Sequence, residues 1–152
     1  MRTIHFRELA AGDEVAYSNW FQITQTHIDA FADATNDHEW IHVDTERAQA
    51  GPLGTTIAHG YLTLSLIGGL LRETMRIDGA AFGINYGLNR VRFPTPVSSG
   101  AKVRLALVIV EATPRDPRST LVRYAATIEL ADSEGPACVA ETMVLYHAAG
   151  DQ

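Results

Sequence analysis

The middle of the chain holds the segment that most constrains its fold, the apolar stretch from Ala58 to Met75. In a helix, the apolar residues of this stretch would cover nearly every direction around the axis: Tyr61, Leu62, Leu64, Leu66, Ile67, Leu70 and Leu71. A helix that is apolar all round must be buried on most sides. The pair Gly68–Gly69 would weaken it by about 1 kcal/mol per residue relative to alanine, which indicates close packing there. We therefore predict a central buried helix that a larger layer covers.

The C-terminal half supplies that layer as β-strands. The runs with strand character are Phe82–Phe93, Lys102–Thr113, Ser119–Leu130 and Ala137–His147. Apolar and polar residues alternate with period two at the start of the second run. Proline, glycine and aspartate in residues 113–117 and 132–136 predict turns. Because consecutive strands joined by short turns pair antiparallel, we expect an antiparallel sheet.

The N-terminal half has helical patterns instead. The spacing of apolar residues predicts a helix from Ile23 to Thr35, with Thr26 and Asp29 as a capping pair, and Asn36–Asp37 ends it. A short helix is expected after Thr45, which would be its N-cap. Helices followed by strands predict an α+β fold, in which the buried helix lies on one face of the sheet.

Length and composition narrow the function classes. The chain has 152 residues, of which 46% are hydrophobic, so we expect one folded domain over residues 1–152. Its most apolar run, residues 61–71, is too short for a membrane span, which needs about 20 residues. The net charge of −6 argues against binding to nucleic acid or to an anionic membrane.

The N-terminus and the cysteine content predict a location. Met1–His5 leads into charged residues rather than into the apolar core of a signal peptide. Cys138 is the only cysteine, so no internal disulfide can form, and its apolar neighbours predict a core residue. We expect a cytoplasmic protein.

The densest polar cluster spans residues 36–44, and part of it matches a zinc motif. His38–Glu39–Trp40–Ile41–His42 has the H-E-x-x-H pattern, in which two histidines on one helix face bind zinc. The preceding helix ends at Asn36–Asp37 and another is expected at Thr45, so the cluster is predicted to be a loop. In a loop this spacing does not align the two histidines, and we expect no metal site.

A second interpretation of the cluster pairs Asp37 with His42. A carboxyl group and an imidazole that converge on one water can act as general base and general acid. Alternatively, Asp37 only terminates the helix and His42 is a structural histidine, which is the more common case for such residues. The residues alone leave both interpretations open.

Three motifs, in the same order, resemble the MaoC-like (R)-specific enoyl-CoA hydratase family of hot-dog fold proteins. Residues 37–44 are similar to the family pattern D-x-N-P-x-H-x-D, residues 57–62 to its A-H-G helix opening, and residues 91–100 to its R-F-x-x-P-V-x-x-G turn. The chain is most similar to the single-domain members labelled nodulation-protein-N-like. It departs from the family where Glu39 and Trp40 replace Asn and Pro, and where Ala101 replaces a frequent Asp.

The resemblance implies a fold, an activity and site residues. The fold would be a long antiparallel sheet wrapped around the central helix. The activity would be reversible (R)-specific hydration of a trans-2-enoyl thioester of CoA or acyl carrier protein, with no cofactor. Asp37 and His42 would be catalytic, and the Gly60 amide at the helix start would polarise the thioester carbonyl. Asn89 and Arg92 are candidate substrate-binding residues, although solvated strand positions are the more common explanation for such residues.

Two further expectations concern alternatives and assembly. A hot-dog thioesterase, which would direct the water at the carbonyl, and a non-catalytic acyl-CoA binding module would have the same fold. A wrapped sheet leaves one edge exposed, and the family's acyl-CoA groove lies near a subunit contact. We therefore expect a homodimer or a dimer of dimers.

Overall fold

A six-stranded sheet forms the main layer in the computed structural model, which describes residues 1–150. Its order is β2-β6-β7-β8-β5, and β3 also pairs with β6. The long strands are β5 (Ala80–Arg92), β6 (Lys102–Asp116), β7 (Ser119–Leu130) and β8 (Cys138–Ala148). The short ones, β2 (Ala16–Tyr17) and β3 (Phe21–Gln22), cover the free edge of β6. All of these pairings are antiparallel, as predicted.

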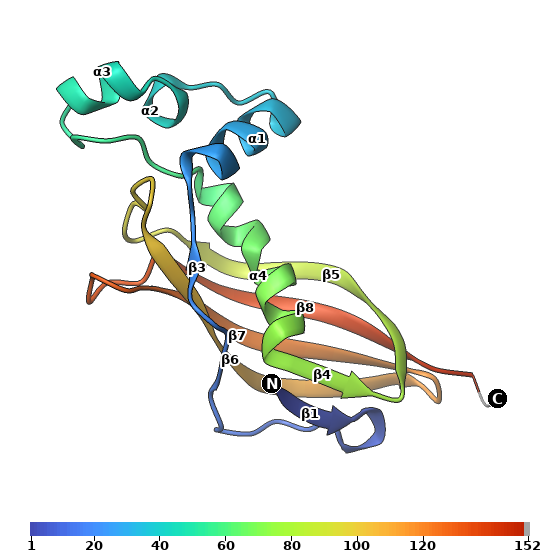
Figure 1. The fold of residues 1–152 in the computed structure, drawn as a ribbon. Helices are drawn as coiled ribbons and strands as arrows, with labels where there is room; N and C mark the ends of the chain where they lie inside the picture. Colours follow the sequence, from blue (N-terminus) through green and yellow to red (C-terminus); the bar gives the residue numbers. More distant parts are fainter. Residues whose placement is uncertain (151–152) are drawn as a thin grey trace.

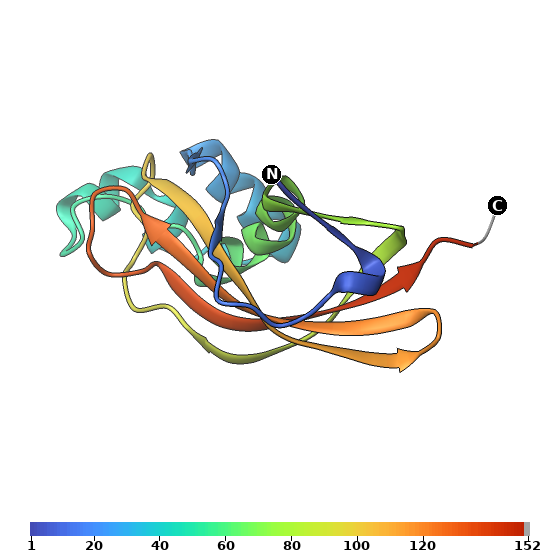
Figure 2. The same cartoon turned by 90° about the horizontal axis from the view of Figure 1, so that it is seen from below.

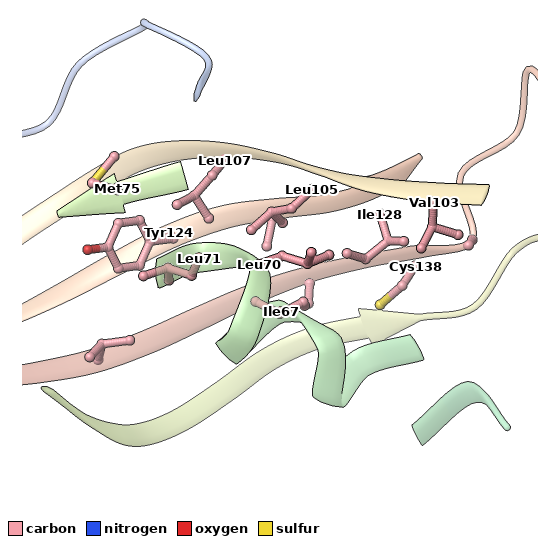
Figure 3. Packing of buried hydrophobic residues seen from close by; sticks show 14 of the residues in the cluster. Ile67, Leu70, Leu71, Met75, Val103, Leu105, Leu107, Tyr124, Ile128 and Cys138 are labelled. Atoms are coloured by element: carbon pink, nitrogen blue, oxygen red, sulfur yellow. The ribbon is translucent and has the colours of Figure 1, made fainter. Parts of the chain in front are cut away.

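The helix α4 (Gly60–Thr74) lies in the concave face of this sheet (Figures 1 and 2). Ile67, Leu70 and Leu71 of α4 face Leu105 and Leu107 of β6, with Ile128 of β7 and Cys138 of β8 nearby (Figure 3). Burial of each large aliphatic side chain contributes about 1.5–3 kcal/mol. The predicted central helix and the hot-dog arrangement are confirmed.

The helix is less completely buried than its sequence predicts. Tyr61 is 69% exposed, and Leu64 and Leu66 are only partly buried. The close packing expected at Gly68–Gly69 is wrong within residues 1–150, because a Cβ at either position would have no atom within 4 Å apart from the backbone of its own helix. The sheet covers one side of α4, and the opposite side is open in a single chain.

The C-terminal end of β6 differs from the prediction. Residues 113–116 are strand and not turn: Pro114 pairs with Thr120, and the turn is confined to Pro117–Arg118, where the Asp116 carboxylate accepts from the Arg118 amide. β5 and β6 follow one another along the chain but do not pair, because β5 lies at the opposite edge of the sheet beside β8. The edge of β6 is occupied by β2 and β3 instead.

The helices α1 (Gln25–Thr35), α2 (Trp40–Val43) and α3 (Thr45–Ala50) gather at one end of the sheet, near the start of α4 (Figure 1). The predicted Thr26–Asp29 cap is wrong. Thr24 caps α1: its hydroxyl accepts from the His27 amide, and the His27 ring accepts from the Thr24 amide. Asp44, and not Thr45, caps α3 through the Arg47 amide.

The N-terminal strand β1 (Arg2–His5) leads into a short 3₁₀ helix (Phe6–Glu8) and pairs in parallel with β4 (Met75–Asp78), directly after α4. This two-stranded sheet was not expected from the sequence. Among residues 1–150, no helix combines the length and apolarity that crossing a membrane requires.

Buried acidic groups in the core predict a loss of stability at alkaline pH. Burial raises the pKa of the Cys138 thiol to about 11, and it also raises the pKa of Tyr124 and of Tyr146. In the unfolded chain these groups ionise near their ordinary values, about 8.5 for cysteine and about 10 for tyrosine. Their contribution to stability is therefore complete below about pH 8.5 and is lost as the pH rises through the folded values. Urea unfolding should show a free energy of unfolding that falls from about pH 8.5 upward.

The matched variants are Tyr146→Phe and Tyr86→Phe, which remove the same hydroxyl from a buried and from an exposed ring. Tyr146→Phe should reduce the alkaline slope of the free energy of unfolding, whereas Tyr86→Phe should leave it unchanged. Equal slopes in wild type and Tyr146→Phe would contradict the assignment of this slope to the buried tyrosine.

Candidate active site

Asp37 lies just beyond the C-terminus of α1. The helix ends at Asn36, whose φ of 57° and ψ of 31° are left-handed, and the Asp37 amide donates to the carbonyl of Ala32 over 3.1 Å. Asparagine tolerates this conformation better than most residues, which explains why the chain turns there. The turn leaves the Asp37 side chain 53% exposed. The predicted helix end thus presents a carboxyl group to solvent.

His42 lies in α2, a single helical turn where a loop was predicted. The side chain is buried, and its Nδ1 lies 2.7 Å from the carbonyl oxygen of Ile57. A carbonyl only accepts, so Nδ1 carries the hydrogen and Nε2 of the neutral ring has a free lone pair. The ring is therefore oriented as a proton acceptor at Nε2.

Gln25 fixes the position of α2, a role that the sequence did not indicate. Its side-chain amide donates to the main-chain carbonyl of His42 over 2.7 Å, and its oxygen accepts from the buried Thr56 hydroxyl over 2.5 Å. One side chain of α1 thus joins the α2 turn to the segment that precedes α4.

His59 was expected to be only structural, but it lies between Asp37 and His42. Its ring stacks on that of His42, with centroids 3.8 Å apart and planes 24° apart. Its Nε2 donates to the main-chain carbonyl of Asp37 over 2.9 Å and lies 4.0 Å from the Asp37 carboxylate. The only feature of the sequence that could have linked His59 to this site was its position directly before Gly60.

Gly60 begins α4, and its amide lies at the positive end of the helix dipole. No side chain caps this helix start. Gly60 and His42 line one pocket of about 240 Å³, together with Ile57, Ala58, Thr63, Phe93, Thr95, Pro96, Val97 and Ala137. A Cβ at Gly60 would lie 3.0 Å from the ring of Phe93, so the close approach requires glycine.

Asn89 and Arg92 do not line this pocket. Both are exposed on β5, where Asn89 is paired with Glu141 and Arg92 with Val139 of β8. The Arg92 guanidinium donates to the carbonyl of Val91. Within one chain the structure places His42 beside Asp37 and, in the pocket, beside Gly60. Asp37, Asn89 and Arg92 are not among the residues that line this pocket.

The geometry of the two buried histidines favours proton transfer over metal binding. Asp37, His42 and His59 offer possible ligand atoms within 4.8 Å of one another. The rings of His42 and His59 are stacked with their planes 24° apart, and each ring nitrogen directs its lone pair within the plane of its own ring. Lone pairs in two nearly parallel planes do not converge on one ion, as the tetrahedral ligation of zinc requires. His38 of the H-E-x-x-H pattern instead pairs with Asp33, at 2.9 Å. The absence of a metal site stays a prediction.

Comparison with known proteins identifies the family. A family described as "MaoC like domain" matches residues 7–130. The chain belongs to the MaoC-like dehydratase family. 3-Hydroxyacyl-thioester dehydratase Z of Mycobacterium tuberculosis (strain CDC 1551 / Oshkosh) is 48% identical over 137 residues, which cover 90% of this chain and 91% of that protein. As a member of this family, the chain is a hydratase or dehydratase.

Other relatives confirm the predicted subgroup and fold. Nodulation protein N of Rhizobium leguminosarum bv. viciae is 43% identical over 136 residues, which cover 88% of this chain and 84% of that protein. The unliganded R-hydratase PhaJ1 from Pseudomonas aeruginosa superposes with a TM-score of 0.77 over 94% of this chain and 85% of that one, at 23% identity. At that identity the likeness shows the fold alone.

Proposed function

We propose that this MaoC-like protein adds water reversibly to a trans-2-enoyl thioester and gives a (3R)-3-hydroxyacyl thioester of CoA or acyl carrier protein. The observation that carries the proposal is the position of His42 between two other groups. It offers an atom within 4.8 Å of the Asp37 carboxyl, and it lines one pocket with Gly60 at the start of α4. The relative named 3-hydroxyacyl-thioester dehydratase Z supports the same class of substrate.

Asp37 and His42 would together handle the water. Its oxygen forms a bond to C3 while one of the two side chains takes a proton, and the π electrons of the C2–C3 double bond move toward the thioester carbonyl. The resulting enolate then takes a proton at C2 from the Asp37–His42 pair, so that H and OH of one water are added across the double bond and the pair returns to its starting protonation. Dehydration is the same sequence reversed. Both side chains hold acceptor atoms suited to this exchange.

Gly60 would stabilise the enolate oxygen. Main-chain amides at a helix start point outward and carry partial positive charge, so they favour developing negative charge. The absence of a Cβ lets the thioester approach the backbone. Removal of one such donor in other enzymes costs about 10²–10³-fold in turnover, which sets the scale of this contribution.

The test is incubation of the purified protein with a short trans-2-enoyl-CoA, followed by chiral analysis of the product. We expect (3R)-3-hydroxyacyl-CoA, and the enoyl thioester again when that product is supplied. Formation of the (3S) product, or no hydration at all, would contradict the proposal. Release of free thiol from a saturated acyl-CoA would instead favour the thioesterase.

We also propose that two copies pair along β5. This strand lies at the sheet edge, and its exposed side chains include Phe82, Ile84, Tyr86 and Leu88, each 45–58% exposed. A cavity of about 270 Å³ between α4 and β5 opens beside them. Exposed strand edges and apolar surface favour association with another copy.

Ile84→Lys should weaken this dimer, because it places a charge in the apolar row of the edge strand. Sedimentation analysis should show a dimer for the wild type and a larger monomer fraction for Ile84→Lys. The control is Leu53→Lys, which alters an equally exposed side chain in the loop after α3 and should remain dimeric. A wild type that is monomeric and fully active at high dilution would rule out the proposed dimer.

A further inference from the structure

We propose that His59 is a positioning residue whose hydrogen bond to the main chain of Asp37 sets the position of Asp37 relative to His42. This inference rests on the proposed function, because it names what aligns the proposed catalytic pair. His59 is 2% exposed and is the N-cap residue of α4, so it belongs to none of the elements that carry the pair. Its side chain nevertheless contacts both of them.

The contact with Asp37 is a hydrogen bond to the main chain. Nε2 of His59 donates to the carbonyl of Asp37 over 2.9 Å. Asp37 has just left the α-helix at a left-handed residue, so its side-chain direction depends on how the main chain is held there. The bond anchors that main chain to the start of α4, beside Gly60. Asp37 is thereby placed relative to the proposed oxyanion site.

The contact with His42 is made by the ring face. The two imidazoles stack at 3.8 Å, and Phe31 of α1 packs on His59 with a centroid distance of 5.0 Å. His59 is thus held between α1 and α2, whereas the His42 ring is oriented by the bond that its own Nδ1 donates to Ile57. Nδ1 of His59 is buried without a hydrogen-bond partner among the described residues. The contacts of its ring are therefore the packing against Phe31 and His42 and the Nε2 bond to Asp37.

The two contacts can be separated by substitution. His59→Phe keeps a planar ring but loses the N–H donor, whereas His59→Gln keeps a donor at Nε2 and loses the ring. Displacement of a catalytic group by about 1 Å can cost about 10²-fold in rate. We expect His59→Phe to lower kcat by about 10²-fold with KM for the enoyl thioester unchanged, because positioning acts on the reaction step. His59→Gln should recover most of kcat.

A packing role alone predicts the opposite order, with His59→Phe active and His59→Gln impaired, and that order would overturn the proposal. Thermal melting checks that each variant is folded. Should His59→Phe fail to fold, His59→Gln decides: near-wild-type kcat supports the proposal, and a 10²-fold loss in folded protein overturns it. The matched control is His38→Phe, a change at an exposed histidine that pairs with Asp33 and should leave kcat unchanged.

Combination with Asp37→Asn separates this inference from the proposed function. If His59 acts through Asp37, His59→Phe should reduce kcat little further in the Asp37→Asn background. An undiminished further loss would show that His59 acts elsewhere and would overturn the inference. If Asp37→Asn and His42→Gln themselves hydrate normally, the proposed function fails, whatever His59→Phe does.

Discussion

Asp37→Asn and His42→Gln are each expected to lower turnover of the enoyl thioester by about 10²- to 10⁴-fold, the usual contribution of a positioned acid or base. Asparagine cannot take a proton, and glutamine lacks the Nε2 lone pair of the imidazole. If the two groups act on one water, as proposed, the double variant should be little worse than the poorer single one. Steady-state kinetics with a short trans-2-enoyl-CoA measures the turnover of the two single variants and of the double variant.

Protein stability should change little for Asp37→Asn, because its side chain is half exposed and packs little. Glu39→Gln is the matched control: it neutralises a neighbouring carboxylate that is exposed and makes no side-chain cap to α2. It should keep nearly full activity. If Asp37 served only to terminate α1, Asp37→Asn would melt earlier and hydrate normally, and that result would remove the carboxyl group from the mechanism.

Gly60→Ala is expected to lower turnover by about 10²-fold, the scale for misplacement of a reacting group by about 1 Å. The new methyl group would lie 3.0–3.2 Å from three ring carbons of Phe93 and would also stand where the thioester must approach the amide. KM should rise as well, because the thioester itself is kept away. Thermal melting reports the clash with Phe93, and kinetics on the same preparation reports the blocked approach of the thioester.

Phe93→Leu in the Gly60→Ala background distinguishes packing from substrate approach. The smaller side chain gives the methyl group room, so the melting temperature should return toward that of Phe93→Leu alone. Turnover should stay low, because the methyl group still blocks the amide. Recovery of turnover together with stability would show that Gly60 is required only by Phe93, and the oxyanion role would then be wrong. Gly69→Ala is a helix control, since nothing lies within 4 Å of its Cβ position.

Much of the fold was predictable because its signals are local. The apolar pattern of residues 58–75 predicted α4, and the strand runs predicted β5 to β8 to within three residues at each end. Ser119–Leu130 was predicted without error. The caps of α1 and α3 were wrong because several neighbouring residues can cap a helix. Which one does so depends on the extended conformation of Thr24 and Asp44, and only the folded chain fixes that conformation.

The catalytic candidates were predictable for a different reason. Asp37, His42 and Gly60 occur in short motifs whose spacing is visible along the chain, so a family resemblance could single them out. Asn89 lies in none of these motifs, and Arg92 begins the third one. The structure leaves both residues on the exposed edge strand.

The sequence by itself determined that this chain buries one helix in an antiparallel sheet, and it placed a candidate acid–base pair, Asp37 and His42, just after the first helix. Tertiary structure alone decided that β5 lies at the open edge, that α2 is a helical turn, and that His59 joins the site. His59 bonds to a carbonyl 22 residues earlier, and Gln25 binds Thr56, which lies 31 residues later. Such contacts leave no periodic or local trace in the sequence, because they exist only once separate elements pack together.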